Sequence, residues 1–283
     1  MDVYLEDPEQ VLYPNLSFPQ NLTYLTLTIN WGEAAPKIQP EDFICFKPLT
    51  RLRVLDYSYV DSSSNCEGFF MTSYLILQNL ESKNLEVLSM WSDSSEEITF
   101  EMNGLFQSML KFPHLKELIF QQRVEFNDVF QTKLEQITLL CLHQVSVLKL
   151  AGLFSLENIR SFEYHFPHDA DTDYYNQVFK IVSQMISLEE LVLEAHSDKR
   201  VALEDQCFNN FLIGIQGLEK LRCIIVEFTN ISIPKSRIPA YLDRYLYHRR
   251  FKLVSIRLEL VSFSHKEYLV YDVEEENDGY SLF

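Results

Sequence analysis

Apolar residues recur along this chain in a short, fixed pattern. The clearest example runs from Leu22 to Asn30, where Leu fills the first, fourth and sixth positions and Asn the ninth. Alternate residues of a strand face opposite sides, so the fourth and sixth positions point together toward a core. The first position covers the entry to the strand. The pattern therefore predicts a short, half-buried strand.

The pattern occurs nine times. Successive first positions are 30, 33, 30, 22, 22, 29, 33 and 32 residues apart. One register stays open, because Val145/Leu148/Leu150 also fits and competes with the match that begins at Ile137. The first, fourth and sixth residues of the nine matches are Leu22/Leu25/Leu27, Leu52/Leu55/Tyr57, Leu85/Leu88/Met90, Leu115/Leu118/Phe120, Ile137/Leu140/Leu142, Ile159/Phe162/Tyr164, Leu188/Leu191/Leu193, Leu221/Ile224/Val226 and Leu253/Ile256/Leu258.

Stretches with helical spacing lie between the predicted strands, at residues 69–80, 104–110, 175–185, 205–215 and 240–246. The two 22-residue units have room only for a turn or a 3₁₀ segment, so we expect an irregular middle around residues 137–159. Residues 31–45, 61–66, 92–97 and 168–173 are interpreted as loops.

No single unit can bury its apolar face alone, so neighbouring units must stack. The prediction is an α/β leucine-rich-repeat solenoid, a horseshoe of about nine strand–helix units with a parallel sheet on its concave face. Residues 1–20 are expected to form an N-terminal cap, 21–263 the solenoid, and 264–283 a C-terminal cap with an acidic tail.

Composition narrows the possible partners. The formal net charge is −17, from 24 Lys and Arg against 41 Asp and Glu. Such a field repels phosphate backbones and anionic lipid surfaces, which argues against nucleic acid and membranes and favours a basic protein surface. The acidic N-terminus does not resemble a signal peptide, and five scattered cysteines suggest reduced thiols. We expect a cytoplasmic or nuclear protein.

Motifs for catalysis, cofactors and metals are absent from the sequence. The seven glycines never cluster as a phosphate loop needs, and no zinc-ligand spacing occurs. Asp169, Asp171 and Asp173 imitate the start of a calcium loop, but Tyr174 and Lys180 replace its Gly and Glu. The basic run at 248–252 follows a predicted helix, where cations complement the helix dipole. We expect a binding protein with no catalytic residue, cofactor or metal.

The predicted concave face consists of the outward-facing strand residues. Trp91 is a typical interface anchor. Glu194, Glu227 and Glu259 repel one another on successive strands, which suggests a cationic partner, although a solvated polar face explains them equally well. The expected partner-binding residues are Trp91, Ile119, Gln121, His143, Glu163, His165, Glu194, Glu227 and Glu259.

The units of about 30 residues, with Leu22–Asn30 as the best match, resemble the ribonuclease-inhibitor or F-box type of leucine-rich repeat. The irregular spacing, low Gly content and heavy Phe and Tyr usage are most similar to fungal F-box/leucine-rich-repeat proteins. That resemblance implies the substrate-recognition part of an SCF-type ubiquitin ligase, with the adaptor Skp1 and a cullin bound through an F-box. Residues 1–21 lack the F-box pattern, so no adaptor-binding residue carries over.

Two alternative functions would use the same concave face. One is a stand-alone scaffold or inhibitor, and the other is an acidic binder of a basic protein such as a histone.

Overall fold

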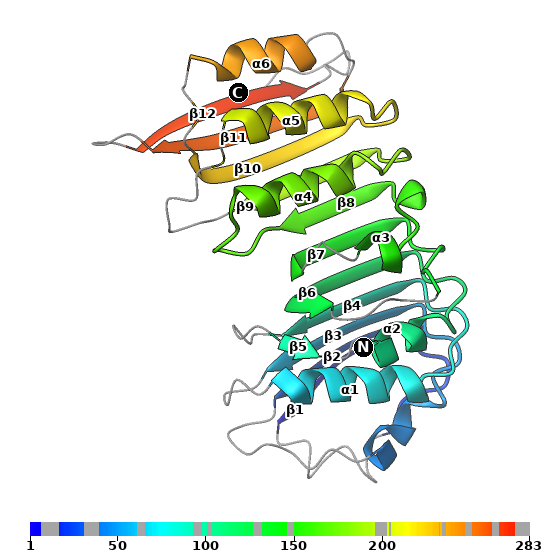
Figure 1. The fold of residues 1–283 in the computed structure, drawn as a ribbon. Helices are drawn as coiled ribbons and strands as arrows, with labels where there is room; N and C mark the ends of the chain where they lie inside the picture. The colour runs from blue at the N-terminus through cyan, green and yellow to red at the C-terminus, as the bar shows by residue number, and fades with distance from the viewer. Residues whose placement is uncertain are drawn as a thin grey trace. The chain divides into compact units, whose positions relative to one another are not determined.

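The structure is a computed structural model, which describes residues 1–6, 17–30, 40–60, 66–92, 98–100, 103–126, 132–145, 150–195, 203, 205–231, 233, 236–246, 251–261 and 266–274. The chain divides into two compact units, Met1–Ser155 (unit 1) and Leu156–Phe283 (unit 2). Each has an α/β architecture with a mostly parallel sheet, and its helices lie over one face of the strands (Figure 1).

Unit 1 contains a parallel sheet in the order β1-β2-β3-β4-β6-β7, with the short β5 beside the end of β6. Its strands are β1 Asp2–Glu6, β2 Tyr24–Asn30, β3 Val54–Val60, β4 Val87–Ser92, β5 Ile98–Phe100, β6 Glu117–Phe126 and β7 Leu139–Val145. Its helical segments are the 3₁₀ helix η2 Pro40–Phe46 and the α-helices α1 Cys66–Asn79, α2 Asn103–Met109 and α3 Leu150–Leu153.

The described part of unit 2 contains five strands in the order β8-β9-β10-β11-β12, of which β12 is antiparallel to its neighbour. The strands are β8 Ser161–His165, β9 Glu190–Ala195, β10 Cys223–Ile231, β11 Leu253–Val261 and β12 Lys266–Glu274. The helical segments are the 3₁₀ helix η4 Leu156–Asn158 and the α-helices α4 Thr172–Val182, α5 Asp205–Gln216 and α6 Ile238–Tyr245. The five predicted helical stretches are thus confirmed, with ends shifted by a few residues.

Strand residues alternate between buried and partly exposed positions, as the pattern predicts. The fourth and sixth residues of the first eight matches are at most 2% exposed. The match that begins at Ile137 is the correct one, because Leu140 and Leu142 pair with Leu118 and Phe120 on β6. Leu150 of the competing match begins α3 instead.

Backbone hydrogen bonds at the second position of each repeat hold the register. In unit 1 the nitrogen of Glu86 donates to the carbonyl of Arg53, and that of Lys116 to Glu86. In unit 2 the nitrogen of Arg222 donates to Glu189, and that of Lys252 to Arg222. The repeat is therefore a structural unit with a fixed hydrogen-bonding position.

The last repeat begins two residues earlier than the sequence predicts. Val226 on β10 pairs with Ile256, and Glu227 pairs with Arg257. The first, fourth and sixth positions are therefore Phe251, Val254 and Ile256, which are all buried. Only an odd shift in register turns a strand over, so a two-residue shift leaves the same residues facing inward. The apolar pattern alone could not separate the two registers.

The structure adds detail to the two ends of the chain and corrects the expectation for one loop. The predicted N-terminal cap contains the paired strand β1, and the expected C-terminal cap contains β12. Part of the loop expected at 31–45 is the helix η2, whose Phe43 and Phe46 are fully buried. The short unit 137–158 carries the one-turn helix α3 and the 3₁₀ segment η4, in line with its length, whereas residues 127–131 of the other short unit lie outside the described residues. Among the described residues, no helix is long and apolar enough to cross a membrane.

Candidate binding face

The helix-free side of each sheet presents the third, fifth and seventh residues of every repeat. β9 shows the reason clearly: Leu191 and Leu193 point into the core, which leaves Val192 and Glu194 partly exposed. Because parallel strands are paired in register, residues at the same repeat position form rows across the strands. These rows are the candidate binding face of each unit.

In unit 2 the row of seventh positions is His165, Glu194, Glu227 and Arg257, with Val270 of β12 at its end. The predicted Glu259 does not belong to this row, because the corrected register puts Arg257 there. Arg257 is exposed, and Val270 is 56% exposed. The acidic series therefore ends with a cation rather than a third glutamate.

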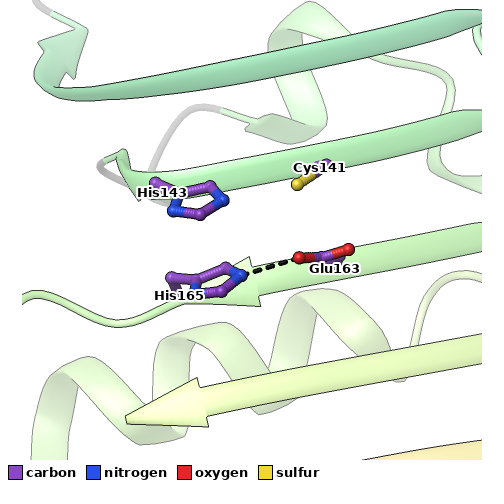
Figure 2. A group of neighbouring side chains, drawn as sticks. All are labelled: Cys141, His143, Glu163 and His165. Carbon is purple, nitrogen blue, oxygen red and sulfur yellow. Dashed lines mark hydrogen bonds and ion pairs between the residues drawn. The ribbon is translucent and has the colours of Figure 1, made fainter. Parts of the chain in front are cut away.

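His165 is held between two carboxylates. Its Nε2 lies 2.7 Å from Oε1 of Glu163, two residues earlier on β8 (Figure 2). Its Nδ1 lies 3.2 Å from Oε2 of Glu194 on β9. A neutral imidazole carries a single N–H, so only the imidazolium form donates to both carboxylates at once. The three side chains are partly exposed, which leaves carboxylate oxygens within reach of a partner.

Glu194 and Glu227 lie opposite each other on β9 and β10. Adjacent strands are about 4.8 Å apart, and like charges directly opposite each other are destabilising. No described residue forms an ion pair or hydrogen bond with the Glu227 side chain, although Arg257 is its register partner on β11. Among the described residues, none therefore offsets the charge of Glu227, and a bound cation would remove the repulsion.

One further titratable group lies in the row of third positions. Cys223 on β10 is the register partner of Glu190 on β9. Burial, and then the negative charge of Glu190, raise the pKa of the Cys223 thiol. The thiol is therefore less ionised than an ordinary cysteine, which argues against its use as a nucleophile here.

The comparable row of unit 1 is neutral. It runs Tyr4, Thr28, Ser58, Trp91, Gln121 and His143. Trp91 is 37% exposed and Tyr4 59%, and the hydroxyls of Thr28 and Ser58 are 2.7 Å apart and hydrogen-bonded. The predicted Ile119 lies one row away on β6, where it pairs with Ser89 and Cys141.

Two strand pairs offer potential metal ligands. Cys141 and His143 are two residues apart on β7, and Glu163 and His165 are two apart on β8 (Figure 2). Each pair provides two ligands from its own strand, whereas structural zinc takes four. Asp171 of the calcium-like series has a structural role instead: its carboxylate caps α4 by accepting a hydrogen bond from the Tyr174 nitrogen at 2.8 Å.

Sequence reasoning missed Tyr4 and assigned Glu259 to the position that Arg257 occupies. Tyr4 lies in a segment interpreted as a cap, although the alternation of Val3, Tyr4 and Leu5 is a strand signal. The basic run at 248–250 and most of the acidic tail lie outside the described residues.

Comparison with known proteins adds no relative. No family model matches the chain, and no curated protein is significantly similar to it.

Within unit 2 the outward residues are charged: the His165 imidazole lies between two carboxylates, and Glu227 lies opposite one of them, Glu194. Within unit 1 they gather hydroxyls and aromatic rings. The outward rows of the two units therefore differ in chemistry.

Proposed function

We propose that this chain is a leucine-rich-repeat solenoid that binds a protein with a basic surface. The main contact in this proposal is the row of seventh positions in unit 2, with Glu194 and Glu227 at its centre. We name it the acidic row after these two residues. The observation that carries it is the opposition of these two glutamates on adjacent strands. A lysine or arginine of the partner placed between them would replace repulsion by two favourable ion pairs.

The overall charge supports the same partner class. A net charge of −17 draws a basic protein toward the chain and repels acidic ones. The leucine-rich-repeat assignment is supported by the nine-fold pattern, the parallel strands within each unit and the backbone hydrogen bonds at the second repeat position.

The test is a titration of the full chain with a short arginine- and lysine-rich peptide at several salt concentrations. We expect the double variant Glu194→Lys/Glu227→Lys to bind about tenfold or more weakly, which corresponds to about 1.4 kcal/mol. The salt dependence of binding should also become shallower, because fewer ion pairs form.

The matched control is Glu157→Lys/Glu219→Lys, which changes the net charge equally at two exposed positions outside the strands of unit 2. If both double variants weaken binding to the same extent, the overall charge attracts the peptide and the row is not its site. If neither variant has an effect, the proposal is wrong.

We further propose that the repeats serve as the substrate-recognition part of an SCF-type ubiquitin ligase in the cytoplasm or nucleus. The support is the likeness of the repeat to F-box/leucine-rich-repeat proteins. Purification of the native protein from its own cells should recover the adaptor and a cullin. Recovery of a basic protein without either would instead favour a stand-alone scaffold or inhibitor.

A further inference from the structure

The outward face of unit 1 contains one acidic side chain next to an exposed indole. Asp56 lies on β3 and Trp91 on β4, and the register pairs Asp56 with Ser89 and Ser58 with Trp91. The two residues are therefore diagonal neighbours on one face, about 8 Å apart from the spacing of strands and the rise along them. We name this pair the Asp56–Trp91 site.

Small hydroxyl residues surround the site. Thr26 and Thr28 of β2 are the register partners of Asp56 and Ser58. The Thr28 and Ser58 hydroxyls bond to each other, so neither needs the carboxylate of Asp56 as a partner. No described residue forms an ion pair or hydrogen bond with Asp56. The site thus combines three features: a carboxylate that has no counter-ion among the described residues, small hydroxyl side chains beside it, and an exposed indole ring.

A guanidinium group has the chemistry to satisfy both members of the pair. Its plane stacks on an indole face, and its N–H groups form directed bonds to a carboxylate. A lysine ammonium is a compact, strongly hydrated charge that lacks the stacking plane. An uncharged side chain would leave the partly buried carboxylate without a counter-ion.

We propose that the Asp56–Trp91 site receives an arginine side chain of the partner protein, stacked on Trp91 and ion-paired with Asp56. This site goes beyond the acidic row of unit 2 and shares no residue with it. A partner that carries a suitably exposed arginine would be distinguished from one that carries only lysines. The site therefore contributes specificity, whereas the acidic row contributes charge attraction.

The site provides its own optical probe. The chain has two tryptophans, Trp31 and Trp91. In the full chain with Trp31→Phe, fluorescence reports Trp91 alone. The probes are capped Gly-Arg-Gly, Gly-Lys-Gly and Gly-citrulline-Gly peptides, of which the last is nearly isosteric with the first but uncharged. We expect a saturable change in emission with arginine, about two- to fivefold weaker binding of lysine, and no saturable response to citrulline.

Asp56→Asn in the same background should remove the preference for arginine over citrulline, whereas Glu157→Gln, an exposed site in unit 2 with the same change of charge, should not. An equal response to arginine and citrulline with Asp56 present would overturn the proposal, and so would an unchanged preference in Asp56→Asn. The first comparison stands even if Asp56→Asn does not fold. Glu194→Lys/Glu227→Lys should leave the Trp91 response intact, so failure of this site and failure of the acidic row are separate results.

Discussion

The two units bury the same repeat positions but present different outward rows. In unit 1 the seventh positions include Thr28, Ser58 and Trp91, which are hydroxylic or aromatic. In unit 2 they include Glu194 and Glu227, which are charged. Packing constrains the inward positions of every repeat, because a truncated core residue leaves a cavity. The outward positions have no such constraint, so core packing does not explain the difference between the two units.

The largest effect on stability should come from the aromatic core that each unit has of its own. Phe69 of unit 1 packs within 6.1 Å of Phe120 between ring centroids, and Phe228 of unit 2 lies 5.8 Å from Phe166. Phe69→Ala and Phe228→Ala should each lower the free energy of unfolding by about 3–5 kcal/mol, measured by urea denaturation.

Hydrogen exchange of the strand amides sharpens this comparison. Each substitution should remove most protection from its own unit if the units unfold separately, and from both if they unfold together. A loss below about 1 kcal/mol for either substitution would show that its cavity collapses, contrary to the close packing seen around both rings.

The sequence predicted the inward half of this fold well. Positions such as Leu25 and Leu191 are specified twice, by strand alternation and by the repeat, so an error in one signal is caught by the other. The last repeat shows the limit. Phe251/Val254/Ile256 and Leu253/Ile256/Leu258 satisfy the same pattern, and only the pairing with β10 separates them.

The outward half was less predictable, because no periodic signal specifies it. The positions of Glu194 and Glu227 followed from a correct register, whereas that of Glu259 did not. The contact of His165 with two carboxylates depends on side-chain rotamers. It also depends on the neighbouring strand β9, because Glu194 follows His165 by 29 residues. Such a contact cannot be derived from spacing alone. The surroundings of Asp56 could not be predicted either, because only the strand register shows which residues share its face.

A medium-sized effect is expected at the aspartate series of unit 2. Asp171→Ala should destabilise the chain by about 1 kcal/mol, because the first turn of α4 loses its capping carboxylate. Asp171→Asn is the matched control and should restore most of the loss, since an amide oxygen also caps. Added Ca²⁺ should leave the unfolding midpoint of the unsubstituted chain unchanged. A clear stabilisation by Ca²⁺ would support the calcium-loop interpretation instead.

Each unit has a pair of polar side chains that face each other on adjacent strands. Substitution within the pair should lower the stability of unit 1 but raise that of unit 2. Thr28→Val removes the hydroxyl that bonds to Ser58 and should cost about 0.5–1.5 kcal/mol. Glu227→Gln removes a like-charge repulsion with Glu194 and should stabilise unit 2 by about 0.2–1 kcal/mol. The same variant should bind the basic peptide more weakly. If Glu227→Gln is less stable than the unsubstituted chain, Glu227 contributes to folding and the argument for a cationic partner weakens.

The smallest effect is expected at an exposed ion pair between repeats. In unit 1, Nε and Nη2 of Arg53 donate to the two carboxylate oxygens of Glu86 at 3.0 and 2.9 Å. Arg237 and Asp205 form the matching pair in unit 2. Such pairs contribute little, since water and salt screen them.

The pH dependence of the Arg53–Glu86 pair follows from its effect on the carboxyl group. The hydrogen bonds from Arg53 lower the pKa of Glu86 below its ordinary value of 4.5. The contribution to stability is therefore present above the unfolded pKa and is lost as the pH falls through the lower, folded pKa. Glu86→Gln should reduce the urea midpoint slightly at pH 7 and less at pH 3, and high salt should shrink the difference at pH 7. An equal difference at both pH values would mean that the glutamine disturbs packing between the repeats rather than an ion pair.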